Sequence, residues 1–274
     1  MPLWLDQAFL HTVDWLYALR RHAPTAQQLR AVRIVSHRGW RDDPAVLENT
    51  CAAFDAVHGS GVFGLEFDVR WTRDRVPLVF HDADFRRLYG SRERVAELTL
   101  EQVRSSFPQV PTLHDVVRRY CGEFHLMVEL KHEPYPEPEL QDRRLAEALA
   151  PALDSRRCHV MSLVPAMFSQ LPSLPASRTM GIARLNADAI SREALAAGRG
   201  GFACHYTALR ERHLRAHHGA GQLVGSGFPV SRELLYREAA RGVDLLFTNQ
   251  APRLERWRQQ ALEAAGPGSP APRG

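Results

Sequence analysis

The sequence predicts an α/β protein, with a (β/α)8 TIM barrel as the leading architecture. Short apolar runs and helical patterns alternate at short spacing over most of the chain. About eight such units fit into one stretch of roughly 250 residues, which is the usual size of such a barrel. A doubly wound open sheet is the alternative that the same alternation allows. With 274 residues and 45% hydrophobic content, the chain can bury a substantial core.

We predict three segments along the chain. Residues 1–32 form an N-terminal helical extension, residues 33–258 form the barrel, and residues 259–274 form a disordered tail, because GPGSPAPRG is rich in Gly, Pro and Ser. In the extension, apolar residues recur at three- and four-residue spacing, which indicates an amphipathic helix. That helix either packs across the bottom of the domain or, through residues 1–22, contacts a membrane surface or a second copy.

The first half of the barrel is predicted from short apolar runs and N-cap signals. Thr99 and either Asn49 or Thr50 can accept the first hydrogen bonds of a helix. Glycines 59 and 61 end the first of these helices. The elements expected are, in order, strand 33–36, helix 48–58, strand 63–69, strand 76–81, helix 98–106 and helix 113–121.

The second half repeats the alternation at closer spacing. Prolines 134, 136 and 138 make a stiff loop before its first helix. The last short strand is expected to close the barrel. The elements expected are strand 124–130, helix 139–153, strand 159–163, helix 165–171, strand 178–183, helix 191–197, strand 201–205, helix 209–218, strand 222–224, helix 231–241 and strand 243–248.

Composition narrows the function classes. The net charge is only +4, and the basic residues form no stripe with interleaved aromatics, so we expect no nucleic-acid partner. The four cysteines are far apart and form no CxxC pair, which predicts reduced thiols in a cytoplasmic protein. No apolar run of about 18 residues is present, so no membrane span is expected. The N-terminus also lacks the pattern of a secretory signal.

Two acidic residues two positions apart, Glu66 and Asp68, end an apolar run in the segment GLEFDVRWTRDRVPLVFHD. On a strand, residues i and i+2 point to the same side, so both carboxylates face one spot. Such a pair can hold a hard divalent cation, which prefers oxygen ligands. An isolated pair is more often a solvated strand end, because acidic side chains are mostly exposed. The pair becomes informative because similar arrangements follow other strands.

Polar side chains also end three more of the expected early strands. The first strand leads into His37 and Arg38, the third into His81, and the fourth into Glu129 and Lys131, again two apart. Lys131 is the only lysine in the chain. Because the carboxyl ends of barrel strands form the catalytic mouth, we expect these groups to converge there with the acidic pair. Each residue alone has an ordinary explanation as a surface or core side chain, but their shared position does not.

This mixture suits phosphoester chemistry. The acidic pair and Glu129 make an oxygen-rich site for one divalent cation, Mg²⁺ or Ca²⁺. Arg38 and Lys131 can neutralise phosphate oxygens, the arginine through a bidentate fork. His37 and His81 can serve as general acid and base, because imidazole titrates near neutral pH.

These residues lie in motifs that together resemble the glycerophosphodiester phosphodiesterase family. The resemblance is spread over residues 33–255, and its early motifs, in this order, are highly specific. The matching segments are HRG at His37, ENT at Glu48 with Ala53-Phe54, LEFDVRWTRDRVPLVFHD from Leu65, VELK up to Lys131, and GVDLLFTNQAP at Gly242–Pro252.

The resemblance implies a TIM barrel of the phospholipase C-like phosphodiesterase type. It implies hydrolysis of glycerophosphodiesters to glycerol 3-phosphate and an alcohol with a divalent metal. It also implies a role for each candidate: metal ligands Glu66, Asp68 and Glu129, the acid/base pair His37 and His81, and the phosphate-binding residues Arg38 and Lys131. The family usually carries a W-T-V-N segment at the eighth strand, where the tryptophan packs on glycerol. Here the segment is GFPV, so Phe228 is the candidate replacement.

Two other functions stay open. Lysophospholipase D-type cleavage of lysophospholipids at a membrane surface fits the N-terminal amphipathic helix and the altered eighth-strand segment. This activity would make the cytoplasmic protein peripheral on the membrane. A catalytically silent binding barrel ranks lower, because it predicts the loss of a ligand or a histidine, and none is missing. In all active cases the partner is a small-molecule glycerophosphodiester or lysophospholipid.

Overall fold

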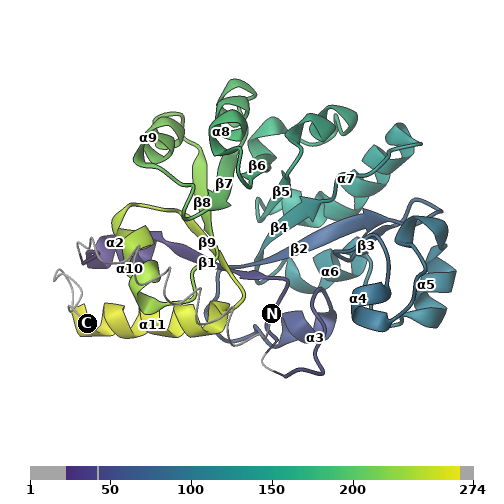
Figure 1. The fold of residues 1–274 in the computed structure, drawn as a ribbon, viewed down its shortest axis with the longest axis horizontal. Coiled ribbons are helices and arrows are strands. Elements are labelled where there is room, and N and C mark those ends of the chain that lie inside the picture. Colours follow the sequence, from purple (N-terminus) through teal and green to yellow (C-terminus); the bar gives the residue numbers. More distant parts are fainter. Residues whose placement is uncertain (1–22, 42, 266–274) are drawn as a thin grey trace.

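The computed structural model describes residues 23–41 and 43–265, and its fold is a closed (β/α)8 barrel (Figure 1). Eight strands pair in parallel, and β1 pairs with both β9 and β2, which closes the ring. The predicted fold class is therefore confirmed, and the open doubly wound sheet is wrong. The barrel strands are β1 Arg33–His37, β2 Gly64–Trp71, β4 His125–Leu130, β5 Cys158–Ser162, β6 Thr179–Ala183, β7 Gly201–His205, β8 Leu223–Gly227 and β9 Leu245–Thr248.

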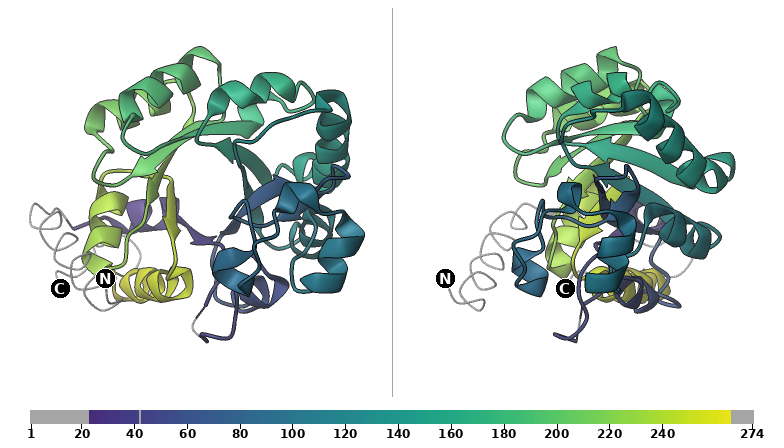
Figure 2. Two further views of the ribbon diagram at one scale, coloured as in Figure 1. Left: turned by 45° about the vertical axis from the view of Figure 1, so that its right-hand side comes forward. Right: turned by 90° about the vertical axis from the view of Figure 1, so that its right-hand side faces the viewer.

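Helices lie around the outside of the strands (Figure 2). Thr50 and Thr99 cap their helices as expected, accepting hydrogen bonds from the backbone N–H groups of Ala53 and Gln102. The predicted helix at 165–171 is instead a 3₁₀ segment, η2 Pro165–Gln170. The α-helices are α2 Ala26–Ala31, α3 Cys51–Asp55, α4 Arg86–Tyr89, α5 Leu100–Ser106, α6 Leu113–Tyr120, α7 Pro138–Asp154, α8 Ala187–Ala196, α9 Glu211–Gly219, α10 Arg232–Ala240 and α11 Ala251–Ala265.

The third predicted strand is not a barrel strand. β3 Pro77–Val79 pairs antiparallel with β2 and lies outside the ring of parallel strands. β2 continues past Asp68 to Trp71, and the chain then folds back, so that the N–H of Phe80 donates to the carbonyl of Asp68 (2.9 Å). His81 therefore reaches the mouth on the return arm of a hairpin, and the prediction that it ends a parallel strand is wrong.

Both ends of the barrel chain differ from the predicted boundaries. The amphipathic helix predicted for residues 1–22 lies outside the described residues. Within the rest of the predicted extension, α2 begins after its own N-cap, Thr25, and packs against α10 and α11. α11 passes residue 258 and reaches Ala265, because Ala261 is buried against the core. The first residues of the predicted disordered tail are thus helical, and residues 266–274 lie outside the described part. The division into domains otherwise stays a prediction.

Three hydrophobic clusters hold the described residues together. The largest fills the layer between the strands and the outer helices. The second fills the barrel interior, where its buried members are Val35, Met127, Met161, Met180, Ala203, Leu245 and Phe247. The third lies in the excursion that runs from β3 to the start of α6, and it includes Phe80, Phe85 and Phe107. This excursion thus carries a small core of its own beside the mouth.

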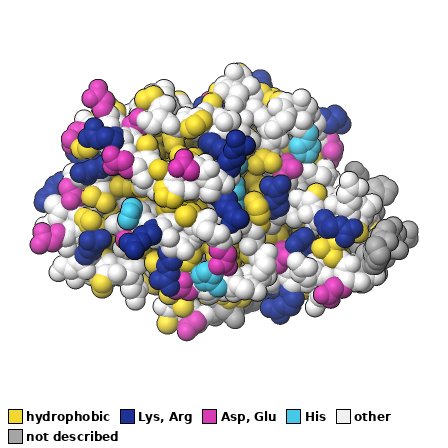
Figure 3. All heavy atoms as spheres, turned by 180° about the vertical axis from the view of Figure 1, so that it is seen from behind, with side chains coloured by type: hydrophobic (Ala, Val, Ile, Leu, Met, Phe, Trp, Pro, Cys, Tyr) yellow, Lys and Arg dark blue, Asp and Glu magenta, His cyan; other side chains and the backbone are white. Residues whose placement is uncertain are grey.

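The surface carries side chains of both charges, and the cysteines are unpaired. Basic and acidic side chains are interspersed on the face drawn in Figure 3, without a uniform basic stripe. All four cysteines are free thiols. Within residues 23–41 and 43–265, the helices are too short or too polar to cross a membrane.

Candidate active site

A cavity of about 700 Å³ opens at the carboxyl ends of the barrel strands. Nearly all the predicted site residues line it, namely His37, Arg38, Glu66, His81, Glu129, Lys131 and Phe228. The remaining one, Asp68, is fully buried and contacts Lys131 and Arg38. The structure therefore brings together every residue that the sequence singled out.

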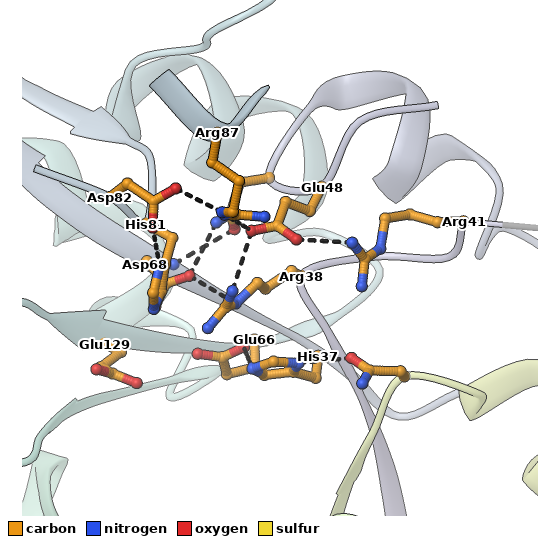
Figure 4. Close-up of polar contacts among 12 residues, drawn as sticks. His37, Arg38, Arg41, Glu48, Glu66, Asp68, His81, Asp82, Arg87 and Glu129 are labelled. Carbon is orange, nitrogen blue, oxygen red and sulfur yellow. Dashed lines mark hydrogen bonds and ion pairs between the residues drawn. The ribbon is translucent and has the colours of Figure 1, made fainter. Parts of the chain in front are cut away.

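Strand register explains why these side chains meet. His37 on β1 is paired with Glu66 on β2, and Asp68 on β2 is paired with Glu129 on β4. Because side chains alternate along a strand, all four point to the same side at neighbouring positions. Figure 4 shows them converging from different strands.

The three carboxylates of Glu66, Asp68 and Glu129 form a compact acidic cluster. They offer ligand oxygens that lie within 4.8 Å of one another, and all three residues are buried. Glu66 Oε2 has no hydrogen-bond partner among the described residues, and His37 Nε2 lies 3.7 Å from it. Burial, followed by repulsion from Asp68 and Glu129, raises the pKa of Glu66 well above its usual range. A buried, unpaired carboxylate oxygen between like charges fits a cation, so this cluster could hold a metal ion.

Asp68 is the most heavily paired member of the cluster. Its Oδ1 lies 2.5 Å from Lys131 Nζ, and its Oδ2 lies 3.0 Å from Arg38 Nε. Asn49 also donates from Nδ2 to Oδ2 at 2.8 Å. Burial alone would raise the pKa of Asp68, but Lys131 and Arg38 outweigh it and lower the pKa to about 2. Asp68 is therefore held as a carboxylate.

The two candidate phosphate-binding residues lie on opposite sides of Asp68. Lys131 Nζ also lies 2.5 Å from Glu129 Oε1, so the ammonium bridges two carboxylates. Arg38 has φ of 58°, a left-handed conformation that costs a non-glycine residue free energy. Its N–H donates to the carbonyl of Glu66 (2.8 Å), which holds the strained residue in place. Both cations face the cavity and can meet an anion there.

The two candidate catalytic histidines have different partners. His37 Nδ1 lies 2.6 Å from Asn249 Oδ1, so a neutral amide accepts its N–H. Burial, and then Arg38, lowers the pKa of His37 to about 4, which keeps the ring neutral at neutral pH. His81 Nδ1 lies 2.6 Å from Asp82 Oδ1, so its partner is a carboxylate. Each ring thus has one nitrogen fixed by the protein.

Several residues of the site were not predicted from the sequence. Asn49, Glu48 and Asn249 were read only as parts of a cap or a motif, yet they contact site residues. His205 also lines the cavity, and its position at the end of β7 is the same signal that identified His37. Asp82 lies directly after His81, but nothing in the sequence says that its carboxylate faces that ring.

The half of the cavity built by β5 to β9 is mainly apolar. Among the described lining residues it carries no carboxylate, and its polar side chains are Arg184, His205 and Thr207. Phe228 packs edge-on against His37, with ring centroids 4.7 Å apart. The apolar lining consists mainly of Met161, Leu163, Ile182, Ala183, Leu185, Ala203, Phe228 and Phe247. The cavity therefore joins a charged half to an apolar half.

A sequence model described as the Glycerophosphoryl diester phosphodiesterase family matches residues 37–172. This stretch holds all the charged and histidine candidates that the sequence predicted. The chain belongs to this family. Among curated relatives, glycerophosphodiester phosphodiesterase 1 of Rattus norvegicus is 34% identical over 114 residues, which is 36% of this chain and 34% of that protein. The chain thus spans about a third of the length of this family member.

Solved structures of family members share the fold. Glycerophosphodiester phosphodiesterase from Agrobacterium tumefaciens str. C58 has a TM-score of 0.68 at 22% identity, covering 82% of this chain and 99% of its own. A phosphodiesterase from Oleispira antarctica, solved in complex with the product sn-glycerol-3-phosphate, has a TM-score of 0.67 at 17% identity, covering 86% and 99%. At these identities the likeness establishes the fold and leaves the activity of this chain to its own site.

Proposed function

We propose that this protein hydrolyses glycerophosphodiesters to glycerol 3-phosphate and an alcohol, using one divalent cation. The observation that carries the proposal is the convergence of three buried carboxylates, two cations and two histidines on one cavity. Family membership supports it, and so does the relative solved with sn-glycerol-3-phosphate. A catalytically silent barrel is disfavoured, because the set is complete and in register.

Glu66, Asp68 and Glu129 would hold the cation. The unpartnered, buried Glu66 Oε2 and the raised pKa of Glu66 are features expected of a carboxylate that binds a cation. A bound Mg²⁺ or Ca²⁺ would supply Lewis-acid stabilisation of charge on phosphate. Both ions accept an all-oxygen site of this kind, so the donor set does not choose between them.

Arg38 and Lys131 would bind the phosphate oxygens. The Arg38 guanidinium is held by Asp68 and Glu48, so it is positioned before substrate arrives. Lys131 provides a compact charge on the other side of Asp68. Positioned cations stabilise the charge that develops in the transition state, because they need no reorganisation at that moment.

His37 and His81 would transfer the protons. One ring takes a proton from the attacking hydroxyl, which we propose is the 2-hydroxyl of the substrate's own glycerol, and the other gives a proton to the leaving alcohol. The resulting cyclic phosphate is then opened by water with the roles exchanged. Asn249 and Asp82 each fix one nitrogen, so that the other nitrogen of each ring is available.

An assay on glycerophosphocholine tests the proposal directly. We expect turnover to glycerol 3-phosphate and choline that EDTA abolishes and that added Mg²⁺ or Ca²⁺ restores. Turnover that is unchanged by EDTA would mean that the reaction does not require a metal. No turnover with any metal would remove the proposed activity.

A second candidate is lysophospholipase D-type cleavage at a membrane surface. Within residues 23–41 and 43–265, the exposed large hydrophobic side chains are Val164, Leu185 and Phe228, and each follows a barrel strand at the mouth. Leu185 is fully exposed, at 102%. An acyl chain could lie over this apolar half, while the phosphodiester meets the charged half.

Lysophosphatidylcholine, compared with glycerophosphocholine, tests the second candidate. If the apolar half binds an acyl chain, Phe228→Ala should lower kcat/KM about tenfold on the lysophospholipid and much less on the deacylated diester. An equal effect on both substrates would instead assign Phe228 to the glycerol or phosphate part that they share. Failure of the wild type to cleave the lysophospholipid would remove this candidate.

A further inference from the structure

A continuous chain of ion pairs joins His81 to Arg38 along the rim of the cavity (Figure 4). Asp82 contacts His81 through Oδ1 and accepts a hydrogen bond from Arg87 Nε through Oδ2, both at 2.6 Å. Arg87 donates from Nη2 to Glu48 Oε1 at 2.5 Å. Glu48 Oε1 also accepts a hydrogen bond from Arg38 Nη1 at 3.0 Å. The two ends of this chain are the residues assigned above to proton transfer and to phosphate.

Glu48 lies at the centre of this chain of ion pairs. Its side chain is only 3% exposed, and it contacts three guanidinium groups, those of Arg38, Arg41 and Arg87. It lies outside the acidic cluster that could hold a metal. A buried carboxylate with this many partners fixes the direction of each guanidinium, because charge-assisted hydrogen bonds are short and directional. Arg38 is thereby held between Glu48 and Asp68.

His81 needs such support more than His37 does. His37 is the last residue of a strand inside the closed barrel, whereas His81 follows a three-residue strand outside it. The ring of His81 is partly exposed, at 28%, and among the described residues Asp82 is the side chain that pairs with it. The excursion supplies the anchor: Arg87 lies on α4, next to the buried Phe85 and its aromatic cluster.

We propose that Asp82, Arg87 and Glu48 are positioning residues, which orient His81 and lock it to the phosphate-binding Arg38. This inference rests on the proposed function, because it acts through His81 and Arg38. It assigns a purpose to the small core of the excursion, which is to carry Arg87 to the junction between Asp82 and Glu48. Substrate phosphate bound at Arg38 then meets a histidine whose placement is set by the same network.

A substitution of Arg87 is the best test of this chain of ion pairs. Its side chain is 47% exposed, and exposed ion pairs contribute little to stability, so Arg87→Gln should fold normally. Glu48 keeps Arg38 and Arg41 as partners in this variant. Arg86→Gln is the matched control, because Arg86 is exposed on the same helix and no ion pair of its side chain is found in the described structure.

Kinetics in two backgrounds separate positioning from a merely structural role. In the wild-type background, Arg87→Gln should lower kcat about tenfold or more, with KM and the melting temperature nearly unchanged. In the His81→Ala background, the same change should have no further effect, because it acts through the missing ring. An equal loss in both backgrounds, or no loss in the wild type, would overturn the proposal. Arg86→Gln should be silent in both.

A measurement that needs no turnover keeps the proposal separate from the proposed function. Nitrogen-15 NMR of labelled histidines should show the Nδ1–H tautomer for His81 in the wild type and its loss in Asp82→Ala. The same tautomer and the same order in Asp82→Ala would overturn the positioning role. If the wild type cleaves no glycerophosphodiester but the NMR result holds, the network orients His81 and the assigned reaction is what fails.

Discussion

The two ends of this barrel each carry a pair of histidines, and the pairs have opposite surroundings. At the carboxyl end, His37 and His81 each bind a polar side chain on one nitrogen and face the cavity. At the amino end, His125 and His159 bind each other, with Nε2 and Nδ1 2.8 Å apart. His125 also stacks on Phe63, with ring centroids 5.1 Å apart. We therefore assign the same residue type to the proposed chemistry at one end and to packing at the other.

Position along the strand decides between these roles. His37 is the last residue of β1, whereas His125 is the first residue of β4. Parallel strands all begin at the same end of a barrel, so residues at strand starts lie far from the mouth. The comparison predicts that substitutions at the mouth change activity and leave stability unchanged. Substitutions at the amino end should change stability and leave activity unchanged.

The largest effect is expected at the acidic cluster of the mouth. Glu66→Ala removes the carboxylate whose buried oxygen lacks a partner, so tight binding of Mg²⁺ or Ca²⁺ should be lost. Activity should fall on the order of a thousandfold, because a metal supplies several kcal/mol of charge stabilisation. Isothermal titration calorimetry measures the binding, and the exposed Glu97→Ala is the control. Unchanged affinity would place the metal elsewhere.

His37→Ala should have the next largest effect. Loss of a general acid or base lowers kcat by about a hundredfold or more, while metal binding and the melting temperature should be retained. His132→Ala is the matched control, since His132 is exposed and does not line this cavity. Turnover close to that of the wild type would remove His37 from the mechanism and leave the two ends of the barrel alike.

A smaller effect is expected at the partner of His37. Asn249→Ala removes the amide oxygen that accepts the Nδ1 hydrogen bond, so the ring loses its orientation but remains present. We expect kcat to fall about tenfold, as is typical when an outer hydrogen-bond partner is removed. The neighbouring Gln250→Ala should be silent. If Asn249→Ala lowers the melting temperature instead of kcat, the Asn249–His37 contact is structural, like the pair at the amino end.

The site residues near strand ends could be predicted from the sequence. The i, i+2 spacing of Glu66 with Asp68 and of Glu129 with Lys131 was enough to predict convergence, because alternation and parallel pairing are general. The hairpin that carries His81 was read as another parallel strand, since three apolar residues do not reveal the direction of pairing. Sequence spacing also could not connect Glu48 with Arg87, because only the folded excursion brings them together.

The smallest expected effect on activity lies at the amino end, where the predicted change is in stability. Burial lowers the pKa of His125 to about 3, with further lowering by His159 and the nearby Arg33, Arg178 and Arg157. Burial likewise lowers the pKa of His159 to about 4. The unfolded chain, with histidine pKa near 6.5, therefore binds more protons than the folded one below that pH. Stability from this pair should be complete above about pH 6.5 and should decline as the pH falls toward 4.

Urea unfolding between pH 8 and pH 4.5 measures this decline, which should amount to a few kcal/mol, on the order given by one or two buried neutral histidines. The double change His125→Gln and His159→Gln keeps a polar pair that does not titrate, so its stability should vary less with pH over this range. Its turnover at pH 8 should stay within about twofold of the wild type, because the pair lies at the far end of the barrel from the mouth. A large loss of turnover with unchanged stability would reverse the comparison, because the amino-end pair would then belong to the chemistry.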